Sequence, residues 1–109
     1  MKRVMYAGSE FVTGDDIAAA LLACGQALAE VGEAEAVTVP TRERDGSVVE
    51  VTVLIGPASQ MVMRHEATTE DELVDEAAIA RLQAIRRRIH PVASVDATPS
   101  AGFDWEDEI

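Results

Sequence analysis

The clearest pattern in the chain is a helical repeat of apolar residues between positions 17 and 31. The apolar positions are Ile17, Leu21, Cys24, Leu28 and Val31, at steps of 4, 3, 4 and 3. Steps of three and four place side chains on one face of a helix. Thr13, three residues before Asp16, forms a capping-box-like start, and Gly32 supplies a left-handed C-cap. The sequence therefore predicts a first helix with one buried face and with close packing against Gly25.

A second helical pattern occupies the region after residue 70. Its apolar positions are Val74, Ala78, Leu82, Ile85 and Ile89, at steps of 4, 4, 3 and 4. Acidic residues accumulate from Thr68 onward, and Arg86, Arg87 and Arg88 end the stripe, which is the charge order that a helix dipole favours. Because proline cannot continue a helix, Pro91 marks the end of this second helix.

Short β-prone runs precede and separate these helices. Val4–Ala7 and Glu10–Thr13 flank Gly8–Ser9, a pair typical of turns, and Gln60–Arg64 forms a further short run. The sequence therefore predicts an N-terminal hairpin and one short strand ahead of the second helix.

A longer hairpin is predicted around Asp45–Gly46, the dipeptide that type I′ turns prefer. If these two residues form the loop, Val39 faces Thr52 and Val37 faces Leu54. In this register one face carries Val37, Val39, Val48 and Leu54, and the other carries Pro40, Val49, Val51, Val53 and Ile55. Since exposed aliphatic side chains are costly, either the second helix covers the second face or another copy of the chain does. A homodimer through the sheet is one of these two solutions.

Together these elements predict an α+β fold of order ββ-α-ββ-β-α. A small, mainly antiparallel sheet of roughly three to five strands then carries two helices. Pro40 places the first strand of the long hairpin at a sheet edge or at a bend. Residues 1–90 are expected to form a single α+β domain. Residues 91–109, rich in Pro, Ser and Ala, are expected to form a flexible acidic tail.

Composition adds information about the surface and about the class of partner. Of the 109 residues, 48% are hydrophobic and 27% are charged, which is ordinary for a folded domain. Nine Lys and Arg against twenty Asp and Glu give a net charge of −11, which argues against nucleic-acid and anionic-membrane partners. A single cysteine forms no internal disulfide, and no run of about 18 apolar residues occurs, so we expect a cytoplasmic protein.

No residue pattern points to catalysis, to a metal or to a cofactor. Cys24 lies on the apolar stripe of the first helix, so we expect it to be buried. His65 and His90 share no metal-ligand spacing. The carboxylates nearest one another before the first helix are Glu10, Asp15 and Asp16. They offer ligands for a cation or groups for acid–base chemistry, but the two aspartates already suit the positive end of a helix dipole.

The last seven residues combine two of the chain's four aromatic residues with four acids. We expect the partner-binding residues to be Phe103, Trp105, Glu106, Asp107, Glu108 and Ile109. In such a segment the rings supply buried area and the acids steer the approach to a basic pocket. Two alternatives stay open: the tail only increases solubility, or it pairs with the basic cluster Arg81, Arg86, Arg87 and Arg88.

These features favour a non-enzymatic acidic protein that binds a protein partner, as an adaptor or as an inhibitor or immunity-type protein for a basic partner. A first alternative is a small enzyme or ligand-binding domain with its site at the Gly8–Asp16 loop and the Gly56–Ser59 turn. A second alternative is a structural subunit of a larger assembly.

Overall fold

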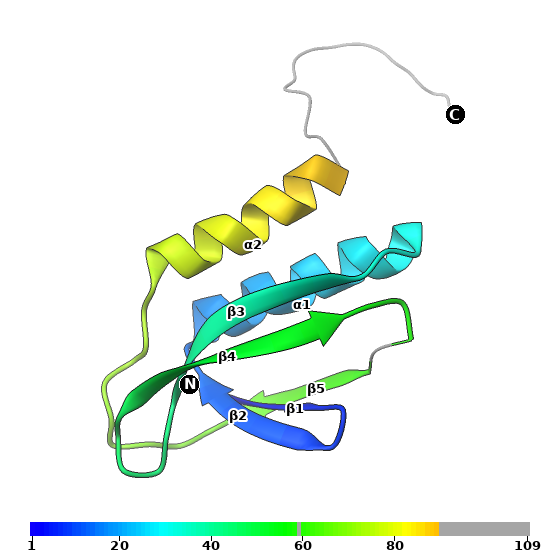
Figure 1. Cartoon of the computed structure of the whole chain (residues 1–109). Helices are drawn as coiled ribbons and strands as arrows, with labels where there is room; N and C mark the ends of the chain where they lie inside the picture. The colour runs from blue at the N-terminus through cyan, green and yellow to red at the C-terminus, as the bar shows by residue number, and fades with distance from the viewer. Residues whose placement is uncertain (59, 90–109) are drawn as a thin grey trace.

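The computed structural model describes residues 1–58 and 60–89. Its elements are β1 (Lys2–Tyr6), β2 (Ser9–Thr13), α1 (Asp15–Val31), β3 (Glu35–Arg42), β4 (Val48–Ile55), β5 (Met61–His65) and α2 (Glu76–Ile89). This order, ββ-α-ββ-β-α, confirms the predicted α+β fold. The five strands form two antiparallel sheets, β2-β1-β5 and β3-β4, instead of one (Figure 1). Within the described ranges, no helix is long and apolar enough to cross a membrane.

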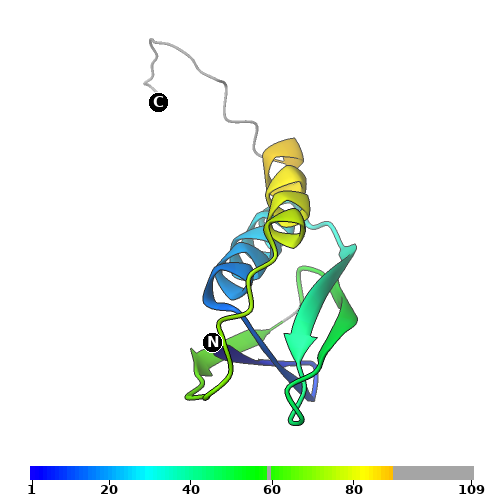
Figure 2. The ribbon, with the colours of Figure 1, turned by 90° about the vertical axis from the view of Figure 1, so that its left-hand side faces the viewer.

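The two helices run side by side and begin at the same end of the molecule (Figure 1). Figure 2 shows both helices above the sheets, with β3 and β4 on one side of the molecule, β5 on the other and the β1–β2 hairpin crossing below. The sheets approach each other where the end of β2 meets β3, because the buried Thr13 hydroxyl donates to the Pro40 carbonyl over 2.7 Å. The two sheets are therefore joined where β2 ends.

The core lies between α1 and the inner faces of the strands, as the helical spacing predicts. Its fully packed residues are Ile17, Leu21, Cys24, Leu28, Val37, Val39, Ile55 and Leu82. For two residues of the predicted stripes, the prediction of burial is wrong. Val31 is 45% exposed because it is the last residue of α1, and Val74 is 63% exposed because α2 begins only at Glu76.

The N-terminus of α1 differs from the prediction, and the C-terminus agrees with it. The N-cap is Gly14, which makes no side-chain capping bond, so the capping box assigned to Thr13 is wrong. Thr13 completes β2 instead, and its hydroxyl is used by Pro40. At the other terminus Gly32 is the predicted left-handed C-cap, at φ 69°, and the Glu33 N–H donates to the Leu28 carbonyl over 3.0 Å.

The register of the long hairpin is shifted by one residue from the prediction. Val39 faces Val51 and Val37 faces Val53. The loop is longer than Asp45–Gly46, because the Gly46 N–H returns to the Glu43 carbonyl and Gly46 takes a φ of 89°. One extra loop residue exchanges the two faces of a strand.

As a result the β3–β4 hairpin has one apolar face and one mixed face, not two apolar ones. The apolar face carries Val37, Val39, Val49, Val51, Val53 and Ile55. Of the strands in the described part of the chain, β3 pairs with β4 alone, so the prediction that Pro40 lies on an edge strand is confirmed. Gly25 is also packed as expected, because a Cβ there would lie 3.3 Å from Ile55 Cγ2. In the N-terminal hairpin the turn residues are Ala7 and Gly8, one position earlier than the Gly8–Ser9 expected.

Candidate functional site

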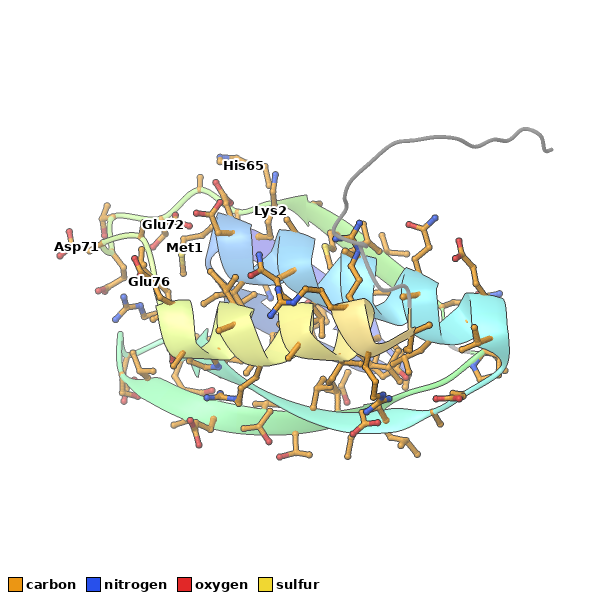
Figure 3. All side chains as sticks on the ribbon, turned by 90° about the horizontal axis from the view of Figure 1, so that it is seen from above. Met1, Lys2, His65, Asp71, Glu72 and Glu76 are labelled. Carbon is orange, nitrogen blue, oxygen red and sulfur yellow. The ribbon has the colours of Figure 1, made fainter. Side chains whose placement is uncertain are left out.

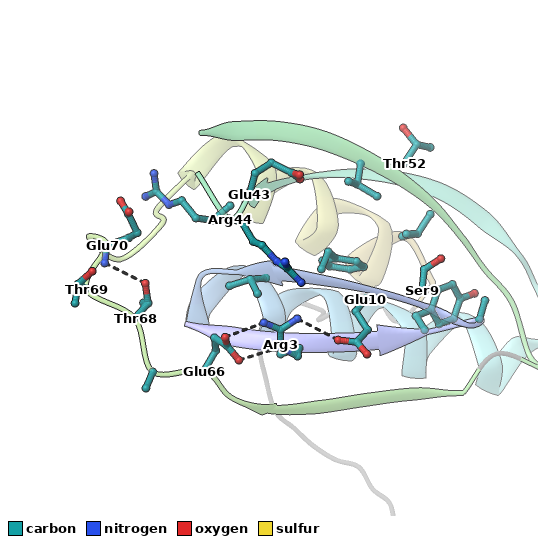
Figure 4. Close-up of a pocket in the computed structure, with 18 of the residues that line it drawn as sticks. Arg3, Ser9, Glu10, Glu43, Arg44, Thr52, Glu66, Thr68, Thr69 and Glu70 are labelled. Atoms are coloured by element: carbon teal, nitrogen blue, oxygen red, sulfur yellow. Dashed lines mark hydrogen bonds and ion pairs between the residues drawn. The ribbon is translucent and has the colours of Figure 1, made fainter. Parts of the chain in front are cut away.

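An open groove lies between the two sheets and has a volume of about 1460 Å³. One wall is β4 and the other is the β1–β2 hairpin, and the segment after β5 closes one end (Figure 4). Four consecutive residues of β2, from Ser9 to Val12, line it, as do four of β4, from Val51 to Leu54. Because successive side chains of a strand point to opposite faces, a wall made of four consecutive residues is the edge of a strand.

The groove has an apolar floor. Phe11, Val51 and Val53 are half-buried and line the groove, and Phe11 and Val53 also pack against the core cluster. Leu54 is 66% exposed at the rim. The Tyr6 hydroxyl donates to the Leu54 carbonyl, so β1 and β4 are joined there. The floor therefore offers apolar contact area that water covers in the free protein.

Charged side chains form the rim, and Arg3 is their centre (Figure 4). Arg3 binds Glu66 through two bonds of 2.9 and 2.8 Å and binds Glu10 through one of 3.0 Å. The paired guanidinium holds the pKa of the Glu66 carboxyl below its usual value. Two carboxylates on one guanidinium leave this cluster with a net charge of −1.

Arg42 lies next to the β3–β4 turn, at the end of the groove that the segment after β5 closes. Arg42 donates to the Gly46 carbonyl over 2.9 Å and to the Asp71 carbonyl over 3.1 Å, and its buried Nε has no partner among the described residues. These bonds tie the hairpin to the segment that follows β5. Glu43 and Glu70 lie beside them on the rim and form no ion pair with a described residue.

A second polar cluster lies where both helices begin (Figure 3). The Met1 side chain is 2% exposed, and the Met1 amino group lies 2.9 Å from the Asp15 carboxylate and 3.0 Å from that of Glu72. Bonding to Asp15 raises the pKa of this amine and lowers the pKa of the Asp15 carboxyl. Glu72 also accepts the Asp15 N–H over 2.5 Å, so a residue far along the chain caps α1. Acids at this end therefore stabilise helix starts.

The sequence-predicted chemical residues are not brought together. Cys24 is buried in the core, as expected, and desolvation raises the pKa of its thiol. His65 ends β5 with its side chain exposed, and His90 lies outside the described residues. Glu10 pairs with Arg3 while Asp15 pairs with the Met1 amine, so these carboxylates belong to different clusters. In residues 1–58 and 60–89 no group of three His, Cys, Asp or Glu side chains is placed to hold a metal.

The two turns named as an alternative site do meet in part. Gly8 and Glu10 line a second hollow of about 840 Å³ together with Gly56 and Ala58. The Asp15 end of that predicted loop lies in the Met1 cluster instead.

The basic cluster of α2 has partners on neighbouring elements. Arg88 lies 3.8 Å from Glu33 and 3.4 Å from Glu35, and Arg81 reaches the Thr38 carbonyl at 3.5 Å. The partner-binding residues expected in the tail, and the pairing of the tail with this cluster, lie outside the described residues.

Sequence reasoning missed the groove. It depends on which edges of β2 and β4 stay unpaired, and no local pattern encodes that. The nearest signal is the β-prone run Glu10–Thr13, which lies in the loop proposed as an alternative site and part of which lines the groove. Comparisons with protein-family models, with curated proteins and with solved structures found no match to this chain.

Proposed function

We propose that this protein is a non-enzymatic binding module for a basic protein partner, as an adaptor or an inhibitor, and that the groove between the sheets receives that partner. The observation that supports this most is the groove itself, with its apolar floor between two strand edges and a rim of four glutamates and three arginines. An apolar centre inside a charged rim is the usual anatomy of a protein-binding surface.

Charge supports a basic partner over a neutral one. The described residues hold fifteen acids against nine bases, and the whole chain carries −11. Acids at the two helix starts are offset by the helix dipoles. Glu43, Glu50 and Glu70 are different, because they are exposed near the groove and form no ion pair with a described residue. A basic partner gains from these charges in its rate of association.

The experiment begins with affinity capture on the full chain and continues with each captured protein after purification. Leu54→Lys and Leu22→Lys form a matched pair, since both leucines are exposed, at 66% and 49%, and only Leu54 lines the groove. We expect a basic partner that Leu54→Lys weakens by about tenfold or more and that Leu22→Lys leaves within about twofold.

Ionic strength provides a second readout. The dissociation constant is expected to rise between 50 and 300 mM salt, by roughly tenfold, because exposed charges are screened. Three results would each contradict the proposed function: an acidic partner, a dissociation constant that does not change with salt, or equal effects of the two leucine variants.

Homodimerisation through the sheet and residence in the cytoplasm remain predictions from sequence. The corrected hairpin register removes one reason for a second copy, because the valines of β4 now face the same side as those of β3. The mass in solution, measured by light scattering, tests the dimer. Fractionation of the source cells tests the location.

A small-molecule site in the hollow between Gly8 and Gly56 is the second candidate. It is favoured by one observation, the meeting there of two turns that are far apart in the sequence. NMR screening of the full chain with a library of small polar fragments tests it. Shifts confined to Gly8, Gly56 and their neighbours would favour this candidate over the groove.

A further inference from the structure

The outer edge of β4 carries backbone groups that no described residue uses. In an antiparallel pair, residues alternate between bonding the partner strand and pointing away from it. Pro40, which has no N–H, faces Glu50, and the Leu54 carbonyl accepts a bond from Tyr6, which lies outside the β3–β4 sheet. Even-numbered residues of β4 therefore point away from β3. The free backbone groups are those of Glu50 and Thr52.

β2 offers a similar edge across the groove. Among the described strands it pairs with β1 alone, and the two-residue turn makes Tyr6 and Ser9 a hydrogen-bonded pair. By the same alternation the backbone groups of Glu10 and Val12 point away from β1. The groove therefore lies between two strand edges that each present unsatisfied donors and acceptors.

From these edges, and resting on the function proposed above, we infer that the groove binds an extended segment of the partner as an added β-strand between β2 and β4. The added strand bonds to the free backbone groups of both edges, as in other cases of strand addition. Since Tyr6 and Leu54 join the walls at one end and the segment after β5 closes the other, the partner segment enters through the open side of the groove.

The side chains that flank the edges determine the sequence of that segment. On the inner side an added strand meets Phe11, Val51 and Val53, so its residues there are apolar. On the outer side it meets Glu50, which forms no ion pair with a described residue, and Glu10, which shares Arg3 with Glu66. Both contribute net negative charge, so the residues of the segment on that side are basic. Neighbouring strands are stabilised by such cross-strand pairs. The occupant is therefore an alternating apolar–basic segment of a partner.

A second copy of this chain fits the edge less well. Two copies each carry −11, and β4 contains Glu50 and no basic residue, so pairing β4 with itself gains no opposite-charge pair. Like charges on neighbouring strands are destabilising. The charge of the edge therefore selects a basic partner over a copy of the chain.

The test uses the ¹⁵N-labelled full chain and a synthetic nine-residue peptide of alternating valine and lysine with blocked ends. One control peptide has the same composition arranged in two blocks. The other is the alternating peptide with N-methyl groups on every second backbone nitrogen, which removes donors to a neighbouring strand. We expect the amides of Glu10, Val12, Glu50 and Thr52 to exchange about tenfold more slowly with saturating alternating peptide, and both controls to bind about tenfold more weakly.

Variants of Glu50 separate the backbone from the charge. Glu50→Pro removes an N–H that points away from β3, a place where an edge strand tolerates proline. Glu50→Gln removes the charge and keeps the N–H. We expect Glu50→Pro to weaken peptide binding about tenfold and Glu50→Gln about threefold, with the circular dichroism spectrum unchanged in both.

Equal binding of the N-methylated peptide, or unprotected edge amides in a saturated complex, overturns the added strand. If the captured basic partner still binds and responds to Leu54→Lys, the proposed function stands and only this binding mode is wrong. If no basic partner binds while the peptide protects the edge amides, the binding mode stands and the proposed partner is wrong.

Discussion

Gly14 is the position where a single methyl group tests the packing of this fold most directly. It lies between β2 and α1, and the chain segment after β5 crosses against it. A Cβ added at Gly14 would lie 1.8 Å from the Leu73 carbonyl oxygen, 2.9 Å from its carbon and 3.2 Å from Glu72 Oε2. Because the nearest atoms belong to the backbone, no side-chain rotation relieves the collision. We therefore predict that Gly14→Ala destabilises the protein.

The magnitude follows from three contributions. Forcing a methyl group into a filled space costs about 1–3 kcal/mol. Displacing the segment at Leu73 also moves Glu72 away from the Asp15 N–H, and the loss of such a cap costs about 1 kcal/mol. Against this, Gly14 has φ −70° and ψ 156°, which alanine adopts readily. The substitution therefore also lowers the conformational entropy of the unfolded chain, which stabilises the protein by about 0.4–1 kcal/mol. The expected net loss is about 2 kcal/mol.

Urea unfolding followed by circular dichroism measures this loss as a lower midpoint at unchanged slope. Gly25→Ala is the control, because its Cβ would approach only the end of the Ile55 side chain, at 3.3 Å, in a helix that favours alanine. A Gly14→Ala protein as stable as the parent, or more stable, would show that the segment after β5 does not lie against Gly14.

Three further predictions concern buried groups and pH. Thr13→Val should cost about 1–2 kcal/mol in urea unfolding, because it leaves the buried Pro40 carbonyl without its donor, and an unchanged midpoint would contradict that bond. Glu66 has a lowered folded pKa, so its contribution is present above its ordinary pKa near 4.5 and is lost as pH falls through the folded value. The urea midpoints of the parent and Glu66→Gln should therefore differ at pH 7 and converge toward pH 3, and a constant difference would contradict this. Cys24 should react with a thiol reagent such as DTNB only as fast as the protein unfolds, since burial raises its pKa and blocks access, and rapid labelling without denaturant would show an exposed thiol.

Local signals located the elements well and located the ends of some of them. The spacing of Ile17, Leu21 and Leu28 identified the buried face of α1, and Gly32 identified its end. The predicted N-cap of α1 was wrong because the Thr13 hydroxyl has two possible acceptor or donor partners. Its hydroxyl fits a capping box locally, but in the folded chain it satisfies the Pro40 carbonyl of a distant strand.

The hairpin register shows the limit of such signals more sharply. Asp45–Gly46 correctly marks the turn, yet the number of loop residues depends on how the strands on either side pack. One residue more in the loop moved Val37 and Val39 to the same face as Val51 and Val53. The register set by that single residue decides whether the second face of the hairpin is apolar. An exposed apolar face there was the strongest reason in the sequence for a dimer.

The amino-acid sequence by itself determined the order of the elements, the buried stripe of α1, the burial of Cys24 and the net charge of −11, because periodicity, turn chemistry and composition are local properties of the chain. Only the tertiary structure decided that the strands divide into two sheets, that Glu72 caps α1 and that Arg3 holds Glu10 and Glu66. It also decided that β2 and β4 each keep a free edge on one groove. These features depend on contacts between residues that are far apart in the chain, whose partners are selected by packing and by the satisfaction of buried polar groups.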